Sequence, residues 1–301
     1  MIKYFRLILV FFVFSSLVMC KQDNEERSET ILEGKTSILV DETLLPIVEE
    51  QVAVFESDYK ADITLIPRSE AEAVQAFLRD SSKIIILARD LTPAELQAFE
   101  KRKIIPERAS FATDAIALLS NKKNTDTLIN IADIISFMQG RTSTRFKGLV
   151  FDNPNSSTVR FIKALAGVND IPATGVYSFK TNEEVIEFVA ENEGMIGVVG
   201  LNWIYEPSAD VEKALASINV LSVKGYNEAQ YYFPSQENLA AGVYPLARDL
   251  FIVNAQGYSG LGMGFGSFIA GDRGQRIILK AGLLPKRLPG RNINIRTKIE
   301  K

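Results

Sequence analysis

The sequence predicts an α/β fold with two lobes, each a mostly parallel sheet flanked by helices, joined by a hinge of two strands. Short apolar runs alternate with amphipathic segments from residue 36 onward, which is typical of strands and helices in a parallel sheet. The length of 301 residues suits about two domains, and 47% of the residues are hydrophobic, which is enough for a core in each lobe.

In the first part of the chain, strands and helices are predicted to alternate three times. The strands cover residues 36–40, 62–66 and 83–87, and the last is buried because it holds four consecutive aliphatic residues. Apolar residues recur at helical spacing from Leu44, and a second helix opens at Ser69. A capping box with proline at the first helical position, TPAE at 92–95, predicts the third helix.

The middle and the end of the chain repeat this pattern. Further strands are predicted over residues 114–120, 148–151, 195–199 and 250–253. Further helices are predicted over 131–138, from Ser156, from a second capping box at 181–184, and twice between 261 and 280.

Two of these strands, near 114–120 and 248–253, are expected to cross between the lobes. Residues 34–115 with 247–301 would then form one lobe and residues 116–246 the other. Ligands of open parallel sheets lie beyond the carboxyl ends of the strands. We therefore expect a binding site between two lobes that close on the ligand.

Residues 1–20 are predicted to be a signal peptide and not part of the fold. A basic start precedes an apolar run that is shorter than a transmembrane helix requires. Cys20, the only cysteine, lies where a bacterial lipoprotein signal places the lipid-bearing residue, although Met19 replaces the small residue usual before it. We expect lipid attachment at Cys20 and a flexible tether over residues 21–33; a plain signal peptide is the alternative.

Composition excludes several classes of function. The chain has no histidine, which removes histidine-based zinc sites, Ser-His-Asp and Cys-His catalysis, and the commonest general base. We predict that the protein is not an enzyme and needs no metal or cofactor. Without residues 1–19 the chain keeps 32 basic and 37 acidic residues, a net charge of −5, which argues against binding to nucleic acid. We expect a monomer.

Four motifs in order resemble the PstS-type phosphate-binding proteins over nearly all of the chain after the signal. They are ARDLT at 88–92, similar to the family's S-R-x-L; DAIALLSN at 114–121, close to D-A-x-A-x-x-x-N; NSST at 155–158, similar to its S-G-T anion loop; and GMIGVVG at 194–200, similar to G-x-I-G-Y-V-G.

This resemblance implies a periplasmic-binding-protein fold with an extracytoplasmic role. The protein would capture phosphate or a related oxyanion in the periplasm or at the cell surface, held to the membrane by its lipid. It would deliver the anion to the permease subunits of an ABC importer. The alternative is a surface lipoprotein with the same fold and a degenerate site, acting in sensing or protein interaction.

Three predicted helix starts supply donors for the oxyanion. Backbone N–H groups at helix N-termini, hydroxyls and a guanidinium group hold such an anion without a metal. The expected ligand-binding residues are Thr43, Leu44, Ser69, Arg89, Ser156, Ser157 and Thr158. The hydroxyls have an alternative role as ordinary helix caps, and Ser69 forms a capping box with Glu72. Arg89 has an alternative role as the partner of a carboxylate.

Three carboxylates near the expected site leave the ligand open. Asp41 and Glu42 stand where the family has small hydroxyl residues, and Asp152 stands where it usually has an arginine. Acidic groups weaken anion binding unless arginines neutralise them or a protonated oxyanion donates a hydrogen bond to one. Phosphate keeps a proton near neutral pH and sulfate does not, so these carboxylates discriminate against fully ionised anions.

Overall fold

The structure is a computed structural model that describes residues 29–80, 82–205 and 207–290. The strands are β1 (Glu33–Asp41), β2 (Lys60–Arg68), β3 (Ile84–Leu87), β4 (Glu107–Asn121), β5 (Leu128–Asn130), β6 (Gly148–Phe151), β7 (Val176–Ser178), β8 (Met195–Gly200), β9 (Ile218–Val220), β10 (Ser222–Lys224), β11 (Ala247–Asn254) and β12 (Leu284–Pro285). The helices are η1 (Glu42–Leu44), α2 (Leu45–Asp58), α3 (Glu70–Leu78), α4 (Pro93–Glu100), α5 (Ile131–Met138), α6 (Ser157–Ala166), α7 (Asn182–Glu191), α8 (Asn202–Tyr205), α9 (Ala209–Leu215), α10 (Gln236–Ala240), α11 (Leu261–Ala270) and α12 (Asp272–Lys280).

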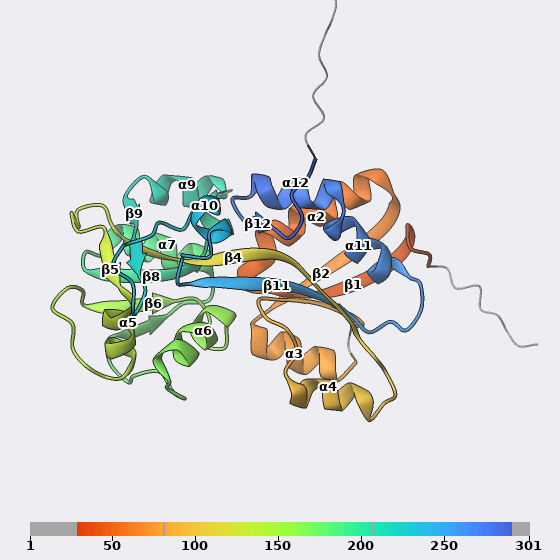
Figure 1. The fold of residues 1–301 in the computed structure, drawn as a ribbon, viewed down its shortest axis with the longest axis horizontal. Coiled ribbons are helices and arrows are strands. Elements are labelled where there is room, and N and C mark those ends of the chain that lie inside the picture. The colour runs from red at the N-terminus through yellow and green to blue at the C-terminus, as the bar shows by residue number, and fades with distance from the viewer. Residues whose placement is uncertain (1–28, 81, 206, 291–301) are drawn as a thin grey trace, which may run out of the picture.

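One long sheet runs through the molecule, with strand order β2-β1-β3-β11-β4-β8-β6-β7 (Figure 1). β1, β2 and β3 are parallel in the first half, and β6, β7 and β8 are parallel in the second half. β11 and β4 lie antiparallel between the two halves, and β4 continues from its pairing with β11 to its pairing with β8. The predicted α/β fold is therefore confirmed, with a parallel set of strands in each half, and the two connecting strands join both sets into one continuous sheet.

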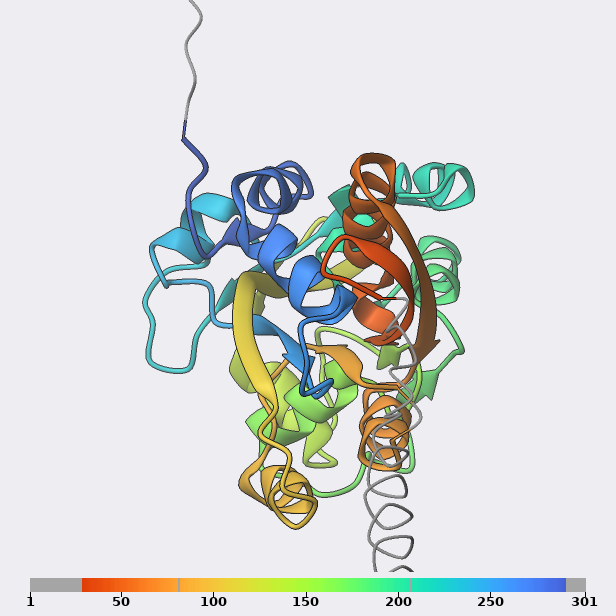
Figure 2. The same cartoon turned by 90° about the vertical axis from the view of Figure 1, so that its right-hand side faces the viewer.

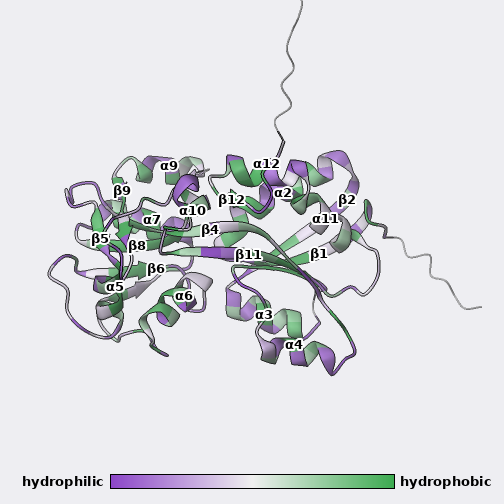
Figure 3. Ribbon diagram, viewed as in Figure 1, coloured by the Kyte–Doolittle hydropathy of each residue, from purple (hydrophilic) through white to green (hydrophobic). Residues whose placement is uncertain are grey.

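Helices cover both faces of the sheet in the first half. Figure 2 shows α2, α11 and α12 on one face and α3 and α4 on the other. Side chains alternate along β1 accordingly: Ile38 and Val40 join the core under α2 and α11, and Leu39 joins the core under α3 and α4. Hydrophobic colour along the inner strands in Figure 3 reflects this burial on both faces.

All of the strands and helices predicted from the sequence are present, with bounds that differ by a few residues at most ends. β4 is the exception, because it begins at Glu107 and has 15 residues, enough to pair with strands of both halves. The sequence pattern does not predict strands β5, β7, β9, β10 and β12 or helices α8, α9 and α10. Each of those strands has two or three residues, which is too short to produce a recognisable period.

The prediction of a flexible tether is wrong for residues 29–33. The Glu29 carboxylate accepts hydrogen bonds from Leu261 N at the start of α11 and from Gln256 Nε2, the latter at 2.8 Å. Glu33 already belongs to β1. A carboxylate at a helix N-terminus is favourable because it meets unpaired N–H groups there. Residues 1–28, with the predicted signal, Cys20 and most of the tether, lie outside the described residues.

The division into lobes at residues 34–115 with 247–301 and at 116–246 stays a prediction. Within the described part of the chain, no helix combines the length and the apolar character that crossing a membrane requires.

Candidate functional site

The first donor group lies where β1 ends. Asp41 caps the short helix η1, and its Oδ1 accepts a hydrogen bond from Thr43 N at 3.1 Å. Thr43 is fully buried, and Trp203 from α8 donates its indole N–H to the Thr43 carbonyl at 2.9 Å. The neighbouring Leu44 side chain belongs to the hydrophobic core, so only the backbone of Leu44 is left to meet a ligand.

The second donor group lies at the N-terminus of α6 in the second half. Ser156 is the N-cap residue and accepts a hydrogen bond from Val159 N at 3.3 Å. Ser157 and Thr158 occupy the first turn, and both are fully buried. The Ser157 hydroxyl lies 2.9 Å from the Thr43 hydroxyl, so the structure brings two of the predicted residues together across the two halves.

Arg248 on β11 joins these two hydroxyls, and it was not among the predicted residues. Its Nη1 donates to Ser157 Oγ at 2.8 Å and its Nη2 donates to Thr43 Oγ1 at 3.3 Å. On its other side, Nε and Nη2 lie 2.9 and 2.8 Å from Asp114 Oδ2 on β4. The guanidinium is almost completely buried, so solvent screens its charge only weakly.

The sequence contains a signal for the ion pair between Arg248 and Asp114. Arg248 and Asp114 each interrupt an apolar strand, and a charge in such a strand needs a partner when both faces are covered. The register of β11 on β4 sets Arg248 directly opposite Asp114. That register is not readable from one sequence, so the pairing was missed.

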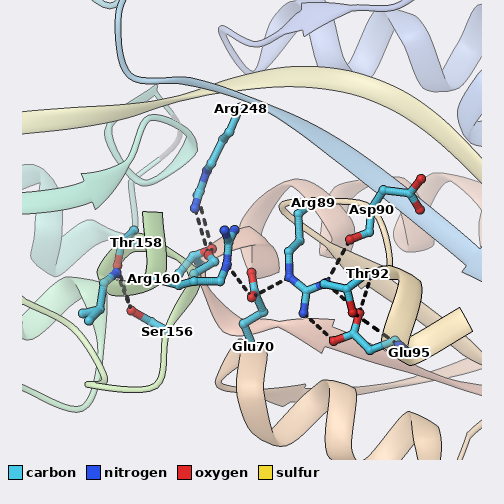
Figure 4. Close-up of polar contacts among 12 residues, drawn as sticks. Glu70, Arg89, Asp90, Thr92, Glu95, Ser156, Thr158, Arg160 and Arg248 are labelled. Atoms are coloured by element: carbon cyan, nitrogen blue, oxygen red, sulfur yellow. Dashed lines mark hydrogen bonds and ion pairs between the residues drawn. The ribbon is translucent and has the colours of Figure 1, made fainter. Parts of the chain in front are cut away.

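Arg89 does not reach the hydroxyls of α6. Its Nη1 and Nη2 each lie 2.8 Å from a Glu95 oxygen, and its Nε donates to Glu70 Oε1 at 2.9 Å (Figure 4). Glu95 also completes the predicted capping box with Thr92. The alternative role of Arg89, a partner for carboxylates, describes these contacts; its role as a ligand contact stays a prediction.

The same Glu70 joins the two halves a second time. Its Oε1 accepts a hydrogen bond from Arg160 Nε on α6 at 2.6 Å, beside the contact with Arg89 (Figure 4). A pocket of about 390 Å³ between α3 and α6 is lined by Glu70, Ser156 and Arg160. Ser69, next to Glu70, turns its hydroxyl to Glu72 Oε2 at 2.8 Å and makes no cap hydrogen bond of its own.

Asp152 occupies the centre of the second donor group. Its Oδ1 accepts hydrogen bonds from Ser156 Oγ at 2.6 Å and from Thr158 Oγ1 at 2.7 Å, and its Oδ2 accepts one from Asn182 Nδ2 at 3.2 Å. The carboxylate is fully buried. Burial raises the pKa of Asp152, and the three hydrogen bonds together with Arg248 counteract part of this rise.

Two more carboxyl groups, those of Asp41 and Glu42, lie near Asp152, and both have raised pKa values. Burial, with Asp152 and Asp41 nearby, raises the pKa of Glu42 to about 7. Burial and the charge of Glu70 raise the pKa of Asp41 to about 6, although Arg248 and hydrogen bonds from neighbouring groups pull it down. Glu42 Oε1 is buried without a hydrogen-bond partner among the described residues. Near neutral pH, Glu42 is therefore poised between its neutral and charged forms.

Asn202 is a further candidate that the sequence reasoning missed. Its side chain is buried, and neither amide atom has a hydrogen-bond partner among the described residues. A Cβ on Gly200 would lie 2.7 Å from Asn202 Oδ1 and 3.4 Å from Arg248 Nη2, so the amide lies close to the guanidinium. In the described ranges, no group of histidine, cysteine and acidic side chains is arranged to hold a metal ion.

Replacing Glu42 with Gln should remove a pH dependence of stability. The raised pKa means that Glu42 stabilises the fold fully below its unfolded-state pKa, and this contribution is lost as pH rises through about 7. Because Glu42 is only half buried, solvent screening limits the effect to about 1 kcal/mol, or roughly 2–4 °C in melting temperature.

Melting curves without ligand should therefore show E42Q equal to the unmodified protein at about pH 4, below the unfolded-state pKa of Glu42, and more stable at about pH 8. The exposed Glu49→Gln on α2 is the matched control and should show no such divergence. A difference between E42Q and the unmodified protein that stays constant over this range would contradict the assignment.

Comparison with known proteins identifies a family and several solved structures that this chain resembles. A family model described as the PBP superfamily domain matches residues 25–273. No curated protein matches the chain significantly in sequence. Among solved structures, a putative phosphate ABC transporter substrate-binding protein with bound phosphate from Clostridium perfringens is similar, with a TM-score of 0.70 and 19% identity over 84% of this chain and 100% of that chain.

Two further structures share the architecture. An ABC-type phosphate transport receptor from Vibrio cholerae matches with a TM-score of 0.64 and 14% identity, covering 84% of this chain and 100% of that chain. PstS from Borrelia burgdorferi matches with a TM-score of 0.53 and 20% identity, covering 84% of this chain and 99% of that chain. The family match over most of the sequence, with the shared fold, shows that the chain belongs to the PBP superfamily.

Proposed function

We propose that the chain is an extracytoplasmic solute-binding protein that captures phosphate, or a related oxyanion, for an ABC importer. The names of the similar structures, which include a phosphate ABC transporter substrate-binding protein with bound phosphate, support this ligand class. Permease subunits of the importer are the proposed partners, and the protein acts as a monomer.

One observation carries the proposal. Hydroxyls from opposite halves, Thr43 and Ser157, meet around the buried guanidinium of Arg248 at the N-terminus of α6. A helix N-terminus carries about half a positive charge and unpaired N–H groups, so it favours an anion. Hydroxyls and a guanidinium add charge-assisted hydrogen bonds to tetrahedral oxygens.

The carboxylates near Thr43, Ser157 and Arg248 favour an anion that carries a proton. Glu42, Asp41 and Asp152 would repel a fully ionised anion, but Glu42 and Asp41 can each accept a hydrogen bond from a protonated one, because Glu42 Oε1 and Asp41 Oδ2 are buried without a hydrogen-bond partner among the described residues. Phosphate keeps a proton near neutral pH and sulfate does not. We therefore expect phosphate to bind in preference to sulfate.

Binding without catalysis is part of the same proposal. The sequence has no histidine, and the polar groups of the site are hydroxyls, carboxylates and arginines that hold one another. The similar structures include a substrate-binding protein and a transport receptor, which supports capture over turnover.

We place the moving lobes at residues 34–115 with 247–301 and at residues 116–246. β4 and β11 connect them, and direct contacts between the halves, Thr43 with Ser157 and Glu70 with Arg160, support a closed arrangement of the described protein. Hinge motion about two connecting strands would open the site to solvent.

Replacing Ser157 and Thr158 together with Ala should weaken phosphate binding about 100-fold or more. Each hydrogen bond to a charged ligand contributes roughly 1.5–3 kcal/mol to the free energy of binding, and about 1.4 kcal/mol corresponds to a tenfold change in the dissociation constant. Titration calorimetry with phosphate, followed by sulfate, arsenate and molybdate, measures this change and the ligand preference.

Ser235→Ala is the matched control, because Ser235 caps α10 by accepting from Asn238 N at 3.3 Å and belongs to neither donor group. It should lose about 1 kcal/mol of stability and keep its phosphate affinity. If the double variant lost stability in the same way with unchanged affinity, the hydroxyls would be helix caps and not ligand donors.

Export and lipid attachment complete the proposal. A lipid on Cys20 would hold the protein at the membrane after removal of the signal, with the chain up to Glu29 as the link to the fold. Cys20→Ser should release soluble protein or accumulate unprocessed precursor, because the thiol that receives the lipid is gone. Fractionation of cells measures the outcome, and a variant as firmly membrane-bound as the unmodified protein would exclude the lipid anchor.

A further inference from the structure

The hydroxyls of Ser156 and Thr158 are not free in the described form. Both donate to one carboxylate oxygen of Asp152, at 2.6 and 2.7 Å, and the two hydroxyls lie 2.8 Å from each other. A hydroxyl has a single O–H to donate. While these contacts last, neither group can donate to an oxyanion from solution.

The Asp152 carboxylate has the features of a bound anion. It lies beside the N-terminus of α6, is fully buried, and receives a third hydrogen bond from Asn182 Nδ2 at 3.2 Å. An oxyanion at the same helix start would take the same hydroxyl protons and would also meet the negative charge of Asp152. Two like charges at contact distance strongly disfavour each other in a buried site.

In the described part of the chain, the arginines near Asp152 already have other carboxylate partners. Arg248, which acts on Asp152 at longer range, is already paired with Asp114. Arg160, on the same helix, turns its Nε to Glu70. The internal carboxylate is therefore held by neutral donors, the same kind of donors that an oxyanion would use.

We propose that Asp152 is a built-in competitor for the oxyanion, because it takes the Ser156 and Thr158 hydroxyls that the ligand needs and has to release them for the ligand to bind. Asp152 then sets the affinity of the site, because the ligand has to displace it from the two hydroxyls. This inference rests on the proposed function, because it assigns the same hydroxyls to the ligand.

The test is calorimetric titration of inorganic phosphate into the purified protein and into Asp152→Asn, at one pH and one ionic strength. Loss of the competing charge should tighten phosphate binding by about tenfold or more, opposite to the effect expected for loss of a ligand contact. Asp133→Asn on α5, where Asp133 pairs with Arg145 outside both donor groups, removes the same charge and should change affinity less than about twofold.

The possible results test the competitor role of Asp152 separately from phosphate binding by the protein. Tighter phosphate binding by Asp152→Asn, or phosphate binding seen only in that variant, supports the role of Asp152 as a competitor. Phosphate binding by the unmodified protein that Asp152→Asn leaves unchanged or weakens overturns the competitor and leaves the function standing. Binding by neither protein overturns both.

A second variant, Asp152→Ser, tests whether a result with Asp152→Asn comes from a folding defect. Asp152→Ser removes the carboxylate and keeps a small polar side chain, and it should also bind phosphate more tightly than the unmodified protein. If Asp152→Asn and Asp152→Ser both failed to fold, the carboxylate would be an essential structural acceptor, and the competitor role would be overturned.

Discussion

The buried ion pair between Arg248 and Asp114 is the interaction on which the site depends. It joins β11 to β4, the two strands that connect the halves, and both side chains are almost completely buried. Removing one partner of such a pair leaves an uncompensated buried charge at a cost of about 3–5 kcal/mol. Because Arg248 also donates to Thr43 and Ser157, the strands that connect the two halves also position the donor groups.

The balance of charge around this pair explains why the halves meet directly. Glu70 takes Arg160 from the opposite half and Arg89 from its own, so most of the positive charge near the site is already matched. Asp152 satisfies hydroxyls at the start of α6 in the same way. A ligand bound at the proposed site would replace existing hydrogen bonds, and its affinity would be the difference between two sets of contacts.

Most of the fold could be predicted from the sequence, because long apolar strands and capped helices leave local signals. The capping box of Thr92 and Glu95 is present as expected, and Ser156 caps α6. The site was less accessible to such reasoning. Arg248 reaches Thr43 only through the register of distant strands, and the contacts of Arg89 with Glu70 and Glu95 depend on how α3 and α4 pack. Local pattern carries neither kind of information.

The crystal structure of the protein with phosphate tests the central claim most directly. We expect a phosphate between the halves, with its oxygens about 2.7–3.2 Å from Arg248 and from the Ser157 and Thr158 hydroxyls, and with Asp152 turned away from these hydroxyls. A phosphate bound elsewhere, or one bound while Asp152 still accepts from Ser156 and Thr158, would contradict it.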